Sequence, residues 1–173
     1  MNLARALAIA LKIREQLAPM CEQIEIAGSI RRARPQVNDI DLVILPKPGQ
    51  TEAIKTRCVV RGVRVTDGPK NSIFRLRLAD QTEIQLDLFF AQPAARDLLS
   101  STPCNFGSLF LCRTGSVAHN IFLVEHAKRM GLIWNPYYGV FDDAGKCLAS
   151  ETEAEIFAAL DLPPIAAEMR ERA

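Results

Sequence analysis

The sequence predicts an α+β fold: a mixed sheet with helices on one face, followed by a smaller α+β domain. Apolar residues recur at helical spacing near the N-terminus, and several segments between residues 39 and 90 alternate apolar with polar residues. Each of these strands would have one core face and one charged face, which is typical of a sheet covered by helices on one side only. The 173 residues are enough for one or two small domains with a real core.

The first expected element is an amphipathic helix. Its apolar residues form one stripe: Leu3, Ala6, Leu7, Ala10, Leu11, Ile13 and Leu17. Lys12, Arg14 and Glu15 interrupt this stripe at helical spacing, which argues against a signal peptide. No apolar run approaches the ~20 residues of a membrane span, so no membrane partner is expected.

The sheet is expected to contain five strands. They are predicted at residues 23–27, 39–45, 59–65, 72–78 and 82–90. A helical segment should follow "GSIRR", a short helix should lie near 50–56, and "DQT" should form a hairpin turn. Alternation puts Asp39 and Asp41 on the face opposite Ile40 and Leu42. In the strand at 82–90, Asp87 shares the polar face in the same way.

A break at "SSTPCNFG" (100–107) predicts two domains, residues 1–100 and 101–173. Beyond it, residues 108–131 are expected to be helical, with two helices meeting at "RTGS". Short strands should follow around "NPYYGVFDDAGK", with a turn at Asp143–Gly145. Ser150 and Glu153 have the spacing of a capping box before a last helix.

The cysteine content and the net charge bear on the redox environment of the protein and on its binding partners. Five cysteines form no CxxC pair and are odd in number, which indicates a reducing, cytoplasmic environment without a disulfide framework. The net charge of +1 is low for a dedicated nucleic-acid binder. The basic residues are nevertheless clustered in the segment 57–77: Arg57, Arg61, Arg64, Lys70, Arg75 and Arg77.

This basic segment has two interpretations, a solvated sheet edge or a surface that follows a phosphate backbone. Arg75 and Arg77 share one face of their strand and are the best candidates for contacts with DNA phosphates. Lys128 is a further candidate on a predicted helix, where it would touch a template backbone or simply face solvent.

Three carboxylates indicate a metal site. Asp39 and Asp41 lie on one face of one strand, and Asp87 lies on the polar face of another. Converging carboxylates repel one another unless positive charge neutralises them, and hard oxygen ligands suit Mg²⁺, with Mn²⁺ as the alternative. Two such ions can bridge an attacking hydroxyl and a transferred phosphate.

A Gly-Ser turn precedes these carboxylates. Gly28 and Ser29 begin a helical segment, whose N–H groups and hydroxyl can hold phosphate oxygens. Arg31 and Arg32 add charge complementary to phosphate. The sequence therefore predicts nucleotidyl transfer.

"GSIRR…NDIDLVI" resembles the nucleotidyltransferase signature, a GS pair followed by DxD. "RTGS" (113–116), "NPYYGVF" (135–141) and "TEAEIFAALDLPPIAAEMRE" (152–171) resemble the thumb of family X DNA polymerases. The resemblance runs from about residue 20 to residue 171. It implies a nucleotidyltransferase palm followed by a thumb, in a minimal, monomeric form without lyase or fingers domains.

The resemblance also implies roles for individual residues. Asp39 and Asp41 would ligate both metals, and Asp87 would ligate the catalytic metal and help to activate the primer 3′-hydroxyl. Ser29 and Arg32 would hold the β and γ phosphates of the dNTP. The full set of implied nucleotide-binding residues is Gly28, Ser29, Arg32, Asn38, Arg113, Gly115, Ser116 and Asn120.

The sequence departs from the family pattern in the second half. Cys112 and Arg113 stand where paired aromatic residues usually precede TGS, and these aromatics line the sugar pocket. Val117 replaces an acidic residue of vertebrate members.

The expected function is DNA-directed DNA synthesis from dNTPs on primer-template or gapped DNA, as in repair of short gaps. One alternative is template-independent transfer to a small molecule, a protein or a tRNA end. Another is a nucleic-acid end-binder with a vestigial site.

Overall fold

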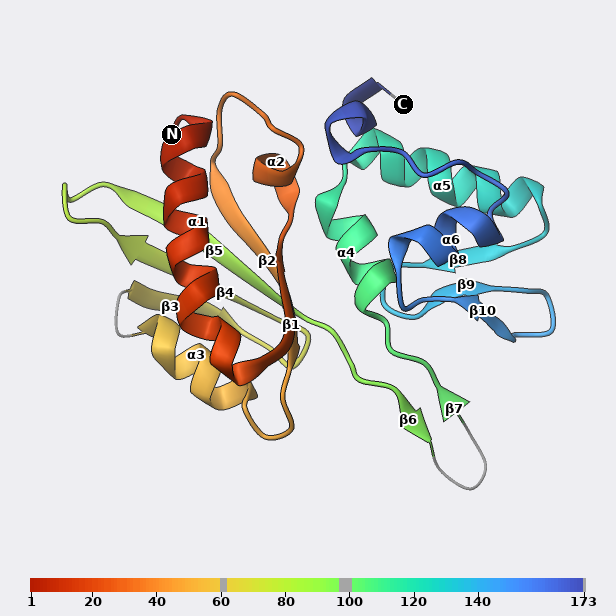
Figure 1. Cartoon of the computed structure of the whole chain (residues 1–173), viewed down its shortest axis with the longest axis horizontal. Coiled ribbons are helices and arrows are strands. Elements are labelled where there is room, and N and C mark those ends of the chain that lie inside the picture. The colour runs from red at the N-terminus through yellow and green to blue at the C-terminus, as the bar shows by residue number, and fades with distance from the viewer. Residues whose placement is uncertain (60–61, 97–100, 173) are drawn as a thin grey trace. The chain divides into compact units, whose positions relative to one another are not determined.

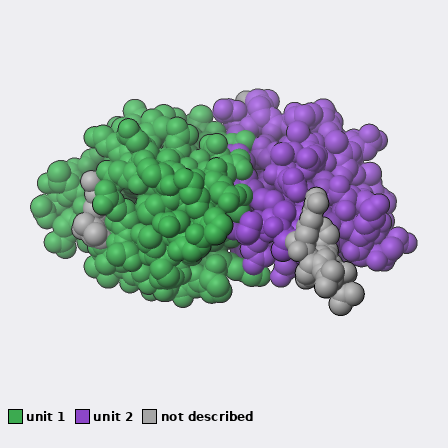
Figure 2. Space-filling model, turned by 60° about the horizontal axis from the view of Figure 1, so that its bottom comes forward, with its two compact units in different colours: residues 1–90 green, residues 91–173 purple. Residues whose placement is uncertain are grey.

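The computed structural model describes residues 1–59, 62–96 and 101–172. It divides into two compact units, residues 1–90 and 91–173 (Figures 1 and 2). The domain boundary expected after residue 100 adjoins residues 97–100, which lie outside the described residues, and it stays a prediction. Among the described residues, no helix has the length and apolar character that crossing a bilayer requires.

The first unit is a five-stranded sheet with helices. Its elements are α1 (Leu3–Leu17), η1 (Ala18–Met20), β1 (Cys21–Ile26), α2 (Gly28–Arg31), β2 (Asp39–Pro46), α3 (Thr51–Val59), β3 (Gly62–Asp67), β4 (Asn71–Arg77) and β5 (Glu83–Phe90). The strand order is β1-β2-β5-β4-β3. Strands β2 and β5 run parallel, and the other neighbours are antiparallel. The predicted mixed sheet of an α+β fold is therefore confirmed.

Helices α1 and α3 pack on the same face of this sheet (Figure 1). Ile40, Leu42 and Ile44 on that face are completely buried. The predicted α1 stripe was wrong in its centre, because Leu7 and Leu11 remain 38% and 41% exposed. The buried residues of α1 are Ala6, Ala10, Ile13 and Leu17. Alanine at the contact lets the helix backbone approach the strands closely.

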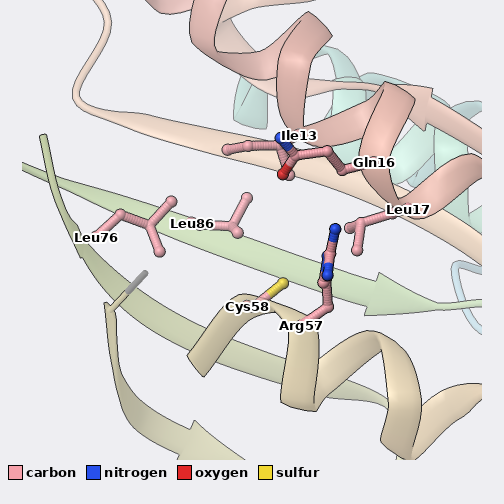
Figure 3. Close-up of a pocket in the computed structure, with 7 residues that line it drawn as sticks. All are labelled: Ile13, Gln16, Leu17, Arg57, Cys58, Leu76 and Leu86. Carbon is pink, nitrogen blue, oxygen red and sulfur yellow. The ribbon is translucent and has the colours of Figure 1, made fainter. Parts of the chain in front are cut away.

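The strand expected at 59–65 begins later, because Val59 is the last residue of α3. Residues 60–61 lie outside the described residues, and β3 starts at Gly62. Cys58 explains the longer helix: it lies one turn after Ile54, and both are buried in the core under the sheet. Cys58 also lines a small cavity on this core face (Figure 3).

The second unit combines helices with a small sheet. Its elements are β6 (Ala95–Arg96), β7 (Ser101–Thr102), α4 (Phe106–Thr114), α5 (Val117–Arg129), β8 (Ile133–Asn135), β9 (Gly139–Phe141), β10 (Cys147–Ala149), α6 (Glu153–Ala159) and η2 (Ala167–Arg172). Strands β8, β9 and β10 form an antiparallel sheet, and the short pair β6–β7 was not predicted. The two helices expected around "RTGS" are present as α4 and α5.

The capping box of α6 lies two residues later than predicted. Thr152 Oγ1 accepts a hydrogen bond from Glu155 N at 3.2 Å, and Glu155 Oε2 accepts one from Thr152 N at 3.3 Å. Ser150 is used elsewhere, because its hydroxyl donates to the carbonyl of Cys104 at 2.8 Å. Glu153 instead pairs with Arg170 at 2.9 Å. Sequence spacing alone allowed both positions for the helix start.

Candidate active site

Asp41 and Asp87 are direct partners on neighbouring parallel strands, β2 and β5. Asp39 occupies the same face of β2, two residues earlier, opposite Gln85. Because neighbouring strands are ~4.8 Å apart and same-face residues on a strand are ~7 Å apart, the three aspartates share one small area. They lie on the face opposite α1 and α3, and all three are half-buried.

The three carboxylates do not form a closed cage. Among the described residues, no three His, Cys, Asp or Glu side chains are gathered closely enough to hold a metal ion. The side chain of Asp39 makes no hydrogen bond or ion pair with the described part of the chain, and Gln85 Nε2 donates to Asp87 Oδ1 at 2.8 Å. Their carboxylate oxygens are nevertheless the donors that suit Mg²⁺.

Gly28 ties the Gly-Ser turn to this carboxylate face. Its φ is +59°, and a Cβ built on it would lie 1.8 Å from Asp41 Oδ2 and 2.7 Å from Asp41 Cγ. The amide of Ala27 donates to the carbonyl of Asp41 at 2.9 Å. Only glycine therefore fits here, and the turn that opens α2 lies directly beside Asp41.

Ser29 has a buried hydroxyl in the turn that opens α2. Its Oγ is buried and has no hydrogen-bond partner among the described residues. A buried hydroxyl without a partner costs free energy, so such a group is expected to be satisfied by something that binds. The first N–H groups of α2 have no acceptor within the helix and lie in the same turn. Hydroxyl and amides together form a set of donors suited to an anion.

The other predicted residues of this turn lie at its margins. Arg32 is half-buried at the C-cap of α2, and its amide donates to the carbonyl of Gly28 at 3.2 Å. Asn38 is exposed directly before β2. It lines a groove at that end of the sheet together with Thr82 and Glu83.

Arg75 and Arg77 project from the carboxylate-bearing face of β4. Their side chains are 62% and 68% exposed, and both approach Glu83, at 3.8 and 3.7 Å. These distances are those of loose, solvent-exposed ion pairs, which contribute little to the stability of the fold. A phosphate backbone could therefore compete with Glu83 for both arginines.

Arg57 and Arg64 of the basic segment do not share this face. Arg57 lines the cavity on the core face of the sheet (Figure 3). Arg64 lies over the ring of Phe74, 5.8 Å from its centre, and pairs with Asp67 at 2.6 Å. Arg61 lies outside the described residues. A cluster in the sequence is thus divided between two faces.

In the second unit, Arg113 is held by Tyr137. Arg113 Nη2 donates to the hydroxyl of Tyr137 at 2.6 Å, and its guanidinium lies 5.6 Å from the centre of that ring. Sequence reasoning gave Tyr137 no role in a site. No short-range pattern links residues 24 apart, so this contact required the fold.

Ser116 caps α5. Its Oγ accepts from the amide of His119 at 3.3 Å and donates to the carbonyl of Arg170 at 2.7 Å. The Gly115–Ser116 peptide bond is cis, and Gly115 has a φ of +70°. The "TGS" residues therefore form the junction between α4 and α5 and fasten the C-terminal segment to it.

Asn120 faces back toward the end of α4. Its Nδ2 donates to the carbonyl of Cys112 at 2.9 Å, while its Oδ1 is buried with no hydrogen-bond partner in the described residues. Like Ser29, it holds an unsatisfied polar atom at a position implied for nucleotide binding. Lys128 is exposed at the other end of α5.

His119 is a core residue. It is fully buried between the rings of Phe122 and Phe157, with ring centres 6.4 and 6.1 Å away. Neither ring nitrogen has a hydrogen-bond partner among the described residues. Burial, together with the nearby Arg170 guanidinium, lowers the pKa of His119 to about 4.

Two comparisons show what this chain is similar to. A family model described as DNA polymerase beta thumb matches residues 109–171. A protein from Bacillus subtilis (strain 168), DNA polymerase/3'-5' exonuclease PolX, is 30% identical over 168 residues. The match includes 96% of this chain but only 28% of the relative's length.

Proposed function

This chain is a family X polymerase-like protein, and from that premise we propose that it adds deoxynucleotides from dNTPs to the 3′-hydroxyl of a DNA primer across short gaps. The observation that carries the proposal is the pairing of Asp41 with Asp87 beside the Gly28 turn. The similarity itself supports a nucleotidyltransferase-like enzyme. The chain spans 28% of the relative's length, so the finer activity must be argued from this chain's own residues.

Asp39, Asp41 and Asp87 would hold two Mg²⁺ ions, with Mn²⁺ as a substitute. Bound there, the ions would neutralise charge on the attacking hydroxyl and on the transferred phosphate. The strand register supports this assignment, because all three carboxylates come from rigid strands in one sheet. Asp87 would orient the primer 3′-hydroxyl and accept its proton at a carboxylate oxygen.

The Gly28–Ser29 turn would bind the triphosphate. The unsatisfied Ser29 hydroxyl and the amides that open α2 would donate to phosphate oxygens. Arg32 would add charge next to the leaving pyrophosphate. Because the turn adjoins Asp41, phosphates held there would lie beside the carboxylates.

The second unit would contact the sugar and base. Gly115 and Ser116 would lie against the nucleotide, and Asn120 would reach the minor-groove edge of the new base pair. Arg113 directly precedes the TGS residues of this junction, and its hydrogen bond to Tyr137 limits its freedom. Arg75, Arg77 and Lys128 would bind DNA phosphates without reading sequence.

Exchange of the template base tests this function. A one-nucleotide gap is offered with each of the four template bases in turn, and each dNTP is supplied separately with Mg²⁺ or Mn²⁺. We expect incorporation to follow the template base. Equal incorporation with and without a template would instead support the alternative, transfer to another acceptor such as a tRNA end. No incorporation on any gapped or recessed DNA would refute the proposal.

A further inference from the structure

Gln85 makes a contact for which the proposed chemistry has no role. It lies on the carboxylate-bearing face of β5, and its Nε2 donates to Asp87 Oδ1 at 2.8 Å. The two residues are two positions apart on one strand, so they share a face. This distance is that of a full hydrogen bond.

The neighbours of Gln85 make its lack of charge significant. In the strand register it lies between Asp39 on β2 and Arg75 on β4. A carboxylate at this position would add another negative charge beside Asp39 and Asp87. A lysine or arginine would compete with a metal ion for the same oxygens. The carboxamide of Gln85 donates to Asp87, adds no negative charge and does not compete with a metal ion.

We propose that Gln85 is a positioning residue for Asp87, which fixes the orientation of that carboxylate for metal binding. The inference rests on the proposed function. Outer hydrogen bonds orient ligating carboxylates, and their removal typically costs about 10- to 100-fold in metal affinity or activity. Gln85 holds Oδ1 of Asp87 through a neutral donor, and Asp87 lies opposite Asp41 in the strand register.

The test is Mn²⁺ binding to the full chain, followed by electron paramagnetic resonance of the free ion. Gln85→Met keeps the length of the side chain and removes the donor. Gln85 is exposed, so the fold should persist, which circular dichroism checks. We expect Mn²⁺ affinity to fall about 10- to 100-fold. We expect kcat for nucleotide incorporation to fall while the KM for dNTP stays unchanged. Gln23→Met, at another exposed strand position, is the matched control and should retain the affinity.

A double variant tests whether Gln85 acts through Asp87. In an Asp87→Asn background, Gln85→Met should cause no further loss of Mn²⁺ affinity, because the oriented carboxylate is already gone. An equal loss in both backgrounds would overturn the inference. So would wild-type affinity and kcat in Gln85→Met, while the proposed function would stand if the wild type binds Mn²⁺ and extends primers. A wild type that does neither would overturn both.

Discussion

Gly28 lies directly against Asp41, so that a Cβ on Gly28 would collide with the Asp41 carboxylate, 1.8 Å from Oδ2. The collision is with the functional end of the side chain. The same glycine has a φ of +59°, which side-chain-bearing residues rarely adopt. Gly28 therefore fixes the distance between the proposed phosphate-binding turn and a proposed metal ligand.

Replacement of Gly28 with alanine should damage the site more than the fold. The positive φ costs roughly 1–2 kcal/mol for any L-residue. The added methyl group also displaces the Asp41 carboxylate, so incorporation should fall at least a hundredfold. Gly49→Ala is the matched control, because Gly49 has a φ of +75° and nothing within 4 Å of its added Cβ. Urea unfolding and gap filling on both variants separate strain from collision; equal losses of activity would contradict the prediction.

Ser29→Ala should weaken dNTP binding without loss of stability. The hydroxyl is buried and unsatisfied in the free protein, so its removal takes away no hydrogen bond and relieves a desolvation cost. A hydrogen bond to a charged phosphate is worth about 1.5–3 kcal/mol, so the Kd for dNTP should rise about 10- to 100-fold.

Ser72→Ala provides the opposite control. Ser72 is fully buried, and its hydroxyl donates to Asp67 at 3.1 Å, so this variant should lose stability and keep its dNTP affinity. Denaturant unfolding and nucleotide titration measure both quantities. A Ser29→Ala protein with wild-type dNTP affinity would exclude the hydroxyl from phosphate binding.

His119 should make the second unit sensitive to acid. Its folded pKa of about 4 lies below the ordinary value of 6.5, so the unfolded chain binds more protons between these values. The contribution of neutral His119 to the free energy of unfolding is therefore fully present above about pH 6.5. It declines by a few kcal/mol as the pH falls toward about 4. His119→Phe should unfold with a flatter pH profile across this window. An unchanged profile would mean that other groups cause the decline.

Arg75 and Arg77 should contribute to the salt dependence of DNA binding. With both changed to alanine, the slope of log K against log salt should fall by about 1–2, because each phosphate contact adds about 0.9. Glu83→Gln should strengthen binding, since Glu83 lies 3.8 and 3.7 Å from the two arginines. Arg57→Ala, on the opposite face, is the matched control. If the double variant kept the full slope, both arginines would have to be removed from the DNA contacts.

Alternation along single strands was readable from the sequence. It placed Asp39 and Asp41 away from Ile40 and Leu42, because strand periodicity depends only on neighbouring residues. Register between strands was not readable. The alignment of Asp41 with Asp87 depends on a parallel pairing of segments far apart in the chain, which no local pattern specifies.

The sequence-based predictions that were wrong also depended on contacts between distant segments. The basic segment 57–77 appeared to be one cluster, but a helix and two strands divide it between two faces. Leu7 and Leu11 were expected in the buried stripe of α1, but close packing against the sheet buries Ala6 and Ala10 and leaves the two leucines exposed. Local spacing allowed two positions for the α6 cap. The hydroxyl of Ser150 is used in a hydrogen bond to the carbonyl of Cys104, and Thr152 caps the helix instead.

Single-turnover filling of a one-nucleotide gap tests the central claim most directly. Wild type, Asp41→Asn and Asp87→Asn are compared at saturating Mg²⁺, with DNA binding measured separately. Loss of either charge removes several kcal/mol of transition-state stabilisation, so incorporation should fall at least a hundredfold while DNA affinity is kept. Incorporation by either variant at the wild-type rate would contradict the account.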